Sequence, residues 1–140
     1  CTLAARKDAM TLLMLALFNP AHAEDATLEA KVKAALVETI EMTSAGDLDG
    51  WITKYCDPNR CGEARAREEF KIYQLKQANL KSKLCMNEAK EINVSQTKGD
   101  IASGEEVRWY IKCEGRQMPA AMRFRYDKEA DRVYFSHLGF

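Results

Sequence analysis

Apolar residues recur at helical spacing through the first half of the chain. Over 27–45 an apolar residue stands at every fourth position, which predicts an amphipathic helix. Gly46 is suited to end that helix, and Asp47 is suited to cap a second, short helix that Pro58 ends. A third helix is expected over 63–84, with one buried stripe. The stripe consists of Phe70, Tyr73, Leu80 and Leu84.

Beyond residue 90 the pattern changes to alternation, which is typical of strands buried on one side. Strands are expected over 91–97, 105–113, 120–126 and 132–140. If Arg116 and Gln117 form the tip of the central hairpin, three apolar cross-strand pairs share one register. The pairs are Ile111 with Met122, Trp109 with Phe124, and Val107 with Tyr126. Three helices followed by a meander of about four antiparallel strands predict an α+β fold.

Alternation also assigns side chains to the two faces of this sheet. The face under the helices is expected to carry Trp109, Met122, Phe124, Val133, Phe135 and His137. The outer face is expected to carry Arg108, Tyr110, Arg123, Arg125, Tyr134 and Leu138. In the predicted register Arg108 faces Arg125, a like-charge pair that an anion or an acidic partner would balance. Since Arg and Tyr are enriched at interfaces, the outer face is a candidate partner surface; neutralisation by Glu105, Glu106 or Asp127 is the alternative.

The N-terminal segment has the three parts of a secretory signal peptide. Arg6 and Lys7 precede an apolar stretch over 10–18, and small residues flank His22. The stretch is about half as long as a membrane-spanning helix. We therefore expect a signal peptide over 1–23 and a single domain over 24–140, exported to a bacterial periplasm or secreted. The alternatives are a first helix of a cytosolic domain, a translation start at Met10, or a lipoprotein cleaved before Cys1.

The cysteines that follow such a cleavage are Cys56, Cys61, Cys85 and Cys113. An even number in an exported chain favours two structural disulfides over a redox or zinc site. Cys56 and Cys61 flank a turn-forming tetrapeptide, which favours a local bridge. Cys85 and Cys113 are equidistant from Gly99 and would pair across a hairpin centred there. That register mismatches the apolar faces, so we expect a β-bulge over 87–89 or a diagonal pairing.

Charge and histidine content exclude several kinds of function. The chain has 21 basic and 21 acidic residues, so it has no overall attraction to nucleic acid or to an anionic membrane. His137 is the only histidine after residue 23, which excludes a multi-histidine metal site. No cofactor and no metal are expected, and no segment after the signal peptide is apolar enough to span a membrane.

The element order, Gly46-Asp47 between the first two helices, and the closing strand Arg132-Val133-Tyr134-Phe135 resemble the nuclear-transport-factor-two-like superfamily. The resemblance covers 27–140. The superfamily includes ketosteroid isomerase and the SnoaL-like proteins. It implies a cystatin-like cone, in which helices pack on a curved antiparallel sheet and a pocket lies between them. It also implies a homodimer. The superfamily hosts enzymes, ligand binders and dimerisation modules on one scaffold.

Two functional hypotheses follow from these patterns. The first is a non-catalytic exported domain that binds a small apolar ligand in the cone, or a protein partner through the sheet. The expected ligand-binding residues are Trp51, Trp109, Met122, Phe124, Phe135 and His137. The alternative is an isomerase- or hydratase-type enzyme with His137 as general base, within hydrogen-bond reach of Tyr55, Asp57 or Tyr126. A structural role for His137 and for the turn residue Asp57 is the simpler interpretation, and an inhibitor or chaperone-like factor is a third hypothesis.

Overall fold

The computed structural model describes residues 20–76, 92–112, 115 and 117–138. Its helices are α2 (Pro20–Ser44), α3 (Leu48–Tyr55), α4 (Pro58–Cys61) and α5 (Ala64–Phe70), and a π-helical turn η1 (Lys71–Leu75) continues α5. The strands are β1 (Val94–Lys98), β2 (Val107–Ile111), β3 (Ala120–Asp127) and β4 (Arg132–His137), with a 3₁₀ turn η3 (Ile101–Ser103) before β2. They form one antiparallel sheet in the order β1-β2-β3-β4. The predicted α+β class is therefore confirmed.

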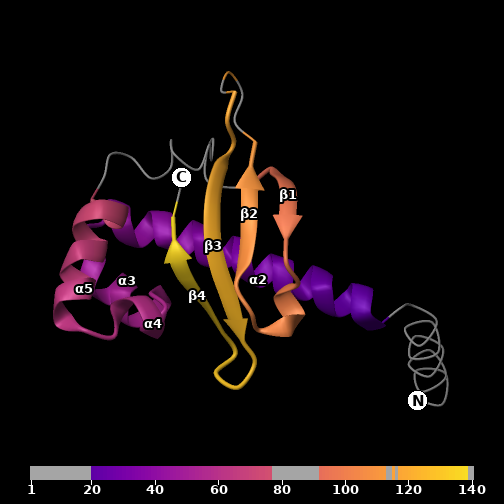
Figure 1. Cartoon of the computed structure of the whole chain (residues 1–140), viewed down its shortest axis with the longest axis horizontal. Coiled ribbons are helices and arrows are strands. Elements are labelled where there is room, and N and C mark those ends of the chain that lie inside the picture. The colour runs from indigo at the N-terminus through magenta and orange to yellow at the C-terminus, as the bar shows by residue number, and fades with distance from the viewer. Residues whose placement is uncertain (1–19, 77–91, 113–114, 116, 139–140) are drawn as a thin grey trace, which may run out of the picture.

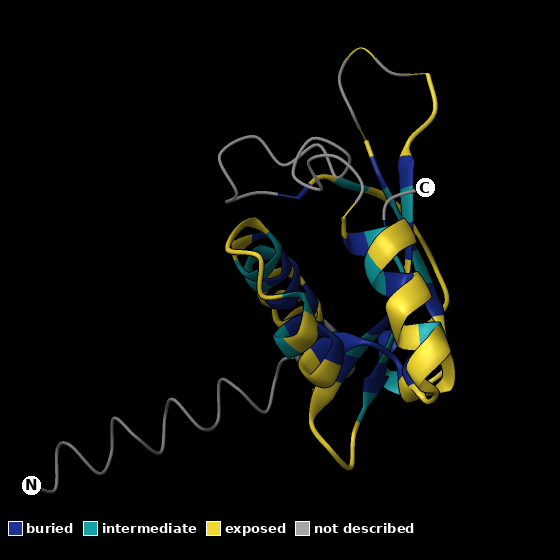
Figure 2. Ribbon diagram, turned by 90° about the vertical axis from the view of Figure 1, so that its left-hand side faces the viewer, coloured by how far each residue is buried: buried dark blue, intermediate teal, exposed yellow. Residues whose placement is uncertain are grey.

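Helix α2 crosses one face of the sheet, and α3, α4 and α5 gather beside β4 (Figure 1). The buried residues lie between α2 and the sheet, while exposed residues cover the outside (Figure 2). The opposite face of the sheet, called the outer face below, is turned towards the viewer in Figure 1. Among the described helices, none combines the length and the apolar character that a membrane crossing requires.

The first two helices form much as the sequence predicts. Helix α2 ends at Ser44, and Gly46 takes a left-handed backbone with φ of 79°. Asp47 caps α3 by accepting a hydrogen bond from the backbone N–H of Gly50 at 3.1 Å. The buried Trp51 indole donates to Thr39 Oγ1 at 2.9 Å and so joins α3 to α2. Of the expected signal peptide, 1–19 lie outside the described residues and 20–23 belong to α2.

The expected third helix over 63–84 differs in its buried stripe. Phe70 is buried as predicted, but Tyr73 is 59% exposed and Leu75 is buried in its place. The reason is the π-helical turn, whose i→i+5 hydrogen bonds place the next inward side chain five residues after Phe70. The predicted core residues Leu80 and Leu84 lie outside the described residues.

The first hairpin is centred differently from the prediction. The η3 turn extends the connection beyond Gly99, and Gln96 faces Tyr110 while Lys98 faces Arg108. In the described strands the hairpin is therefore not centred on Gly99. Cys85, Cys113 and the predicted bulge over 87–89 lie outside the described residues, so their pairing stays a prediction. A bulge does occur in β1, between Val94 and Gln96. The local disulfide Cys56–Cys61 is present as predicted.

The central hairpin keeps its predicted faces but slides by two residues. Trp109 faces Met122 and Val107 faces Phe124, instead of Phe124 and Tyr126. Ile111 pairs with Ala120 instead of Met122, so the connection between the paired residues is two residues shorter than a tip at Arg116 and Gln117 implies. Because side chains alternate with period two, a shift of two leaves every residue on its predicted face.

The last strand corrects the predicted position of His137. Phe135 faces Phe124, but the next pair in the ladder is His137 with Arg123, so Ser136 is an inserted bulge residue. One inserted residue exchanges the faces of everything after it. His137 therefore lies on the outer face beside Arg123, and Leu138, predicted to be outside, is fully buried.

Candidate functional site

The side chains predicted to line a ligand pocket form the hydrophobic core instead. Trp51, Trp109, Met122, Phe124 and Phe135 are at most 1% exposed. Their rings are in contact: Trp51 stacks with Phe135 at 6.2 Å between ring centroids, and Trp109 meets Phe124 edge-on at 4.9 Å. Within the described residues, the indole nitrogen of Trp109 is the one buried side-chain polar atom without a hydrogen-bond partner. The space between α2 and the sheet is thus filled by protein side chains.

The three candidate catalytic residues do not form one site. His137 lies on the outer face, whereas the ring of Tyr55 packs in the core against Phe135 at 6.0 Å between centroids. The Tyr55 hydroxyl donates to Glu38 Oε2. The carboxylate of Asp57 forms an ion pair with the guanidinium of Arg125. This arrangement gives no support to acid–base catalysis with His137 as base and Tyr55 or Asp57 as its neighbour.

Asp57 instead holds α4 against the sheet. Its carboxylate accepts two hydrogen bonds from the Arg125 guanidinium, at 2.8 and 3.2 Å, and caps α4 through the backbone N–H of Asn59. Its own N–H donates to the carbonyl of Phe135 on the edge strand β4 at 2.9 Å. The hydrogen bonds that Arg125 donates to Asp57 are the main reason that the pKa of the guanidinium is raised. The guanidinium also lies over the ring of Tyr134, at 4.9 Å from the centroid.

A row of basic side chains crosses the outer face. Lys98 on β1 faces Arg108 on β2, Arg108 faces Arg123 on β3, and Arg123 faces His137 on β4. The like-charge pair predicted on this face is therefore Arg108 with Arg123, because of the two-residue shift, and not Arg108 with Arg125. Directly opposed like charges destabilise a sheet unless opposite charge is supplied. We call these four residues the basic row.

Among Lys98, Arg108 and Arg123 of the basic row, only Arg123 on β3 lies within ion-pair distance of a described carboxylate. Arg123 approaches Glu106 at 3.9 Å, but within the described residues neither Lys98 nor Arg108 forms an ion pair with a carboxylate. Both contact Tyr110 instead: Arg108 donates to its hydroxyl at 3.3 Å, and the Lys98 ammonium lies 5.4 Å from its ring centroid. The hydrogen bond from Arg108 lowers the pKa of the Tyr110 hydroxyl. The hydrogen bond to Tyr110 and, to a lesser extent, the charge of Glu106 raise the pKa of Arg108, but the positive charge that no ion pair among the described residues engages is concentrated over β1 and β2.

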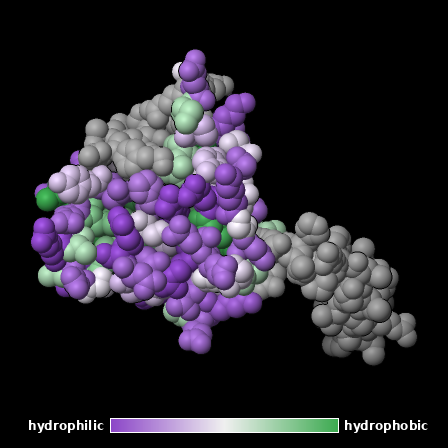
Figure 3. Space-filling view, in the orientation of Figure 1, coloured by the Kyte–Doolittle hydropathy of each residue, from purple (hydrophilic) through white to green (hydrophobic). Residues whose placement is uncertain are grey.

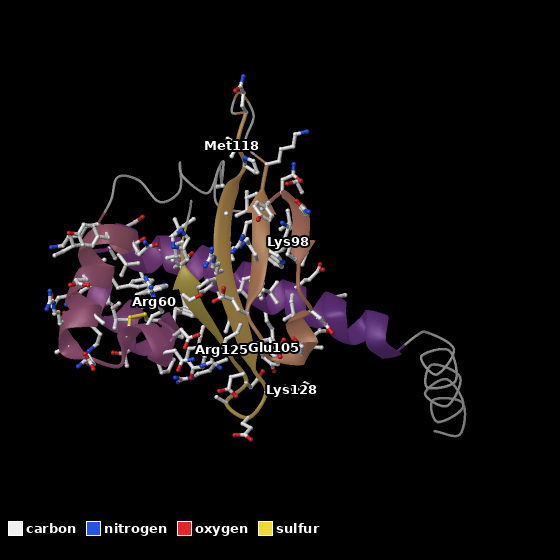
Figure 4. All side chains as sticks on the ribbon, viewed as in Figure 1. Arg60, Lys98, Glu105, Met118, Arg125 and Lys128 are labelled. Atoms are coloured by element: carbon white, nitrogen blue, oxygen red, sulfur yellow. A yellow bond between two sulfur atoms is a disulfide. The ribbon has the colours of Figure 1, made fainter. Side chains whose placement is uncertain are left out.

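The structure brings together all five side chains predicted as a partner surface and adds two to them. Arg108, Tyr110, Arg123, Arg125 and Tyr134 share the outer face. The sequence did not assign Lys98 to this face because the predicted register of β1 was wrong. It did not assign His137 to this face because the bulge at Ser136 was not predicted. The face is mainly hydrophilic in Figure 3, and Figure 4 shows Lys98 on its β1 side, away from Arg125.

A second feature, a groove of about 340 Å³, runs between α2, the end of α3 and the turn that joins β3 to β4. Two similar clusters line it. In one, Lys54 Nζ lies 2.5 Å from Glu38 and the Tyr55 hydroxyl donates to the same carboxylate. The other consists of Lys31, Asp131 and Tyr126, with Lys31 Nζ at 2.6 Å and the Tyr126 hydroxyl at 2.5 Å from Asp131 Oδ1.

Each cluster fixes the protonation state of its members. The hydrogen bond from Lys54 lowers the pKa of Glu38, and the hydrogen bond from Lys31 lowers the pKa of Asp131. Burial raises the pKa of Tyr55, and the hydrogen bond to Asp131 raises the pKa of Tyr126. Both carboxylates therefore stay ionised and both tyrosines stay protonated near neutral pH, which suits binding and disfavours either carboxylate as a general base.

Comparisons of the chain with protein-family models, with curated proteins and with solved structures give no match. The described residues also contain no group of three or more His, Cys, Asp or Glu side chains that could hold a metal ion. The outer face and the groove are therefore the two candidate binding surfaces of the described residues.

Proposed function

We propose that this protein is a non-catalytic binding domain whose outer sheet face binds an acidic segment of a partner protein. The observation that carries the proposal is the basic row. Its like charges oppose one another across neighbouring strands, and Lys98 and Arg108 lack a carboxylate partner within the described residues. An acidic partner would supply the missing charge.

The composition of the face supports a protein as the partner. Tyr110 and Tyr134 stand beside the arginines, and Arg and Tyr are among the residue types that contribute most at protein interfaces. A sheet face is also a rigid platform, since each strand is held by hydrogen bonds to its neighbours. The chain carries equal numbers of acidic and basic residues, so the attraction is local to this face and not a property of the whole protein.

We also propose that the domain is exported and has a cystatin-like cone. An export signal over 1–23 is supported by the order of its basic, apolar and small residues and by the Cys56–Cys61 disulfide, since such bridges persist in oxidising compartments. A cystatin-like cone of the nuclear-transport-factor-two-like kind is supported by a helix packed across one face of a four-stranded antiparallel meander. The space inside the cone is filled by Trp51, Trp109, Phe124 and other core side chains, so we propose no small apolar ligand there.

The experiment measures binding of fluorescein-labelled poly-L-glutamate by fluorescence anisotropy. The variant K98Q/R108Q removes the two uncompensated charges, and K33Q/R67Q is its matched control, because it removes one lysine and one arginine from exposed positions on α2 and α5. We expect K98Q/R108Q to weaken binding by about fivefold for each charge removed. We expect the control to change the affinity by less than about twofold, since distant surface charges are screened by salt.

Two results would overturn the proposal. Equal weakening by the two double variants would mean that net charge, and not this face, governs binding. Tighter binding of single-stranded DNA than of poly-L-glutamate would assign the face to nucleic acid. Circular dichroism of both variants shows whether they are folded, so that loss of binding is not confused with unfolding.

A further inference from the structure

The basic row runs across the strands and not along any one of them. Lys98, Arg108, Arg123 and His137 come one from each strand, and each faces the next across the sheet (Figure 1). Neighbouring strands lie about 4.8 Å apart, so the row repeats at that interval and is about 14 Å long. A partner that follows the row must present its acidic groups at a similar interval.

The charge that lacks an ion pair also lies across the strands. Lys98 and Arg108 face one another on β1 and β2, and neither forms an ion pair with a described carboxylate. On β3, by contrast, Arg125 pairs with Asp57 at 2.8 Å and Arg123 has a carboxylate 3.9 Å away. An extended segment laid along β3 would therefore meet arginines that already have carboxylates beside them.

A helix and an extended strand space their side chains differently. On one face of a strand, side chains repeat at about 6.6–6.8 Å, which exceeds the interval of the row by about 2 Å. On one face of an α-helix, residues three or four apart lie about 4.5–6 Å apart along the axis, and residues seven apart lie about 10.5 Å apart. Two intervals of the row span about 9.6 Å. The spacing of the row therefore matches acidic side chains on one face of a helix.

Two tyrosines flank the row on opposite sides. Tyr110 is two residues from Arg108 along β2. Tyr134 faces Arg125, which is two residues from Arg123 along β3 and lies on the other side of the row. Two residues of a strand span about 7 Å, and a helix with its side chains has a radius of about 5–6 Å. A helix centred on the row would thus have one tyrosine beside each flank.

We propose that the acidic segment of the partner is an α-helix that lies across the strands, with acidic residues at positions i, i+3 or i+4, and i+7 on one face. These residues meet Lys98, Arg108 and Arg123 in turn, and the flanks of the helix contact Tyr110 and Tyr134. This inference rests on the proposed function, because it names the form of the acidic segment that the outer face binds. Lys98 and Arg108 thereby gain carboxylate partners.

The experiment compares three fluorescein-labelled, alanine-rich peptides of about 20 residues and equal net charge by fluorescence anisotropy. The striped peptide carries glutamates at positions i, i+4, i+7 and i+11, the second has the same composition with its glutamates spread around the helix, and the third is the striped peptide with a central proline, which breaks the helix. Circular dichroism verifies that the first two are helical. We expect the striped peptide to bind at least about fivefold more tightly than either of the others, which is the effect of one extra charge pair about 4 Å apart in water.

The variants described above assign the preference to the row. In K98Q/R108Q the preference for the striped peptide should fall below about twofold, since two of the three charge contacts are lost. K33Q/R67Q should keep the preference. Equal affinities of the three peptides for the unmodified protein, all reduced in K98Q/R108Q, would overturn the helical form of the segment and leave the acidic partner in place. Affinities that K98Q/R108Q does not reduce would overturn both proposals.

Discussion

The ion pair between Asp57 and Arg125 should make a large contribution to stability, because it joins α4 to the sheet. Asp57 is nearly buried, with its side chain 7% exposed, and the Arg125 side chain is 23% exposed. The substitution Asp57→Asn keeps the size of the side chain and an oxygen that can still cap α4, but it removes the charge. It therefore leaves the guanidinium of Arg125 partly buried without a full counter-charge.

The expected magnitude lies between two limits. Breaking a fully buried pair costs about 3–5 kcal/mol, whereas an exposed pair contributes about 0–1 kcal/mol. Since Arg125 is partly accessible to water, we expect Asp57→Asn to lower the free energy of unfolding by about 2–3 kcal/mol. With a urea m-value of about 2 kcal/mol/M, the midpoint should fall by about 1–1.5 M.

Urea unfolding followed by tryptophan fluorescence measures this change, and Trp51 and Trp109 are both buried reporters. The matched control is Asp49→Asn, since Asp49 also pairs with a cation, at 2.6 Å from Lys71, but is 88% exposed. We expect the control to leave the midpoint nearly unchanged. In a double-mutant cycle, D57N combined with R125Q should lose less than the sum of the single losses. Equal midpoints for Asp57→Asn and Asp49→Asn would refute the argument.

Two further predictions concern the disulfide and the groove. Replacing Cys56 and Cys61 by serine should lower the free energy of unfolding by about 2 kcal/mol in the chain-entropy model, because the closed loop is short; dithiothreitol should lower the urea midpoint of the unmodified protein by at least as much. The pKa values of Glu38 and Asp131 are lowered on folding, so the unfolded chain binds more protons in acid, and stability should fall as the pH drops below the ordinary carboxyl pKa of about 4. Urea midpoints measured down to about pH 3 check this, and Glu38→Gln should reduce the dependence; a steeper dependence in that variant would contradict the assignment.

Parts of this fold could be predicted because the signals are local. Gly46 and Asp47 mark the junction of α2 and α3 through backbone geometry and capping, which depend on a few adjacent residues. The disulfide between Cys56 and Cys61 needs only a short turn. The faces of β2 and β3 follow from alternation, and they survive the wrong register because it was wrong by two residues.

Other parts could not be predicted because they depend on pairing between distant residues. The π-helical turn that exchanges Tyr73 for Leu75 has no sequence pattern of its own. The bulge at Ser136 has one signal in the sequence, a break in the apolar alternation after Phe135. Val133, Phe135 and Leu138 are the buried residues on either side of this break. The groove joins residues about one hundred positions apart, as in the contact of Lys31 with Asp131.

The class of fold and a basic, tyrosine-bearing sheet face follow from the amino-acid sequence, because side-chain periodicity is a property of each segment alone. Tertiary structure decided where the charges of that face stand. The shift of two residues places Arg123 opposite Arg108. The inserted residue Ser136 places His137 on the outer face, at the end of the basic row, and not on the core face that alternation predicts. Side chains alternate between the two faces of a strand with a period of two residues. A shift by one residue therefore decides whether a side chain faces the core or the solvent.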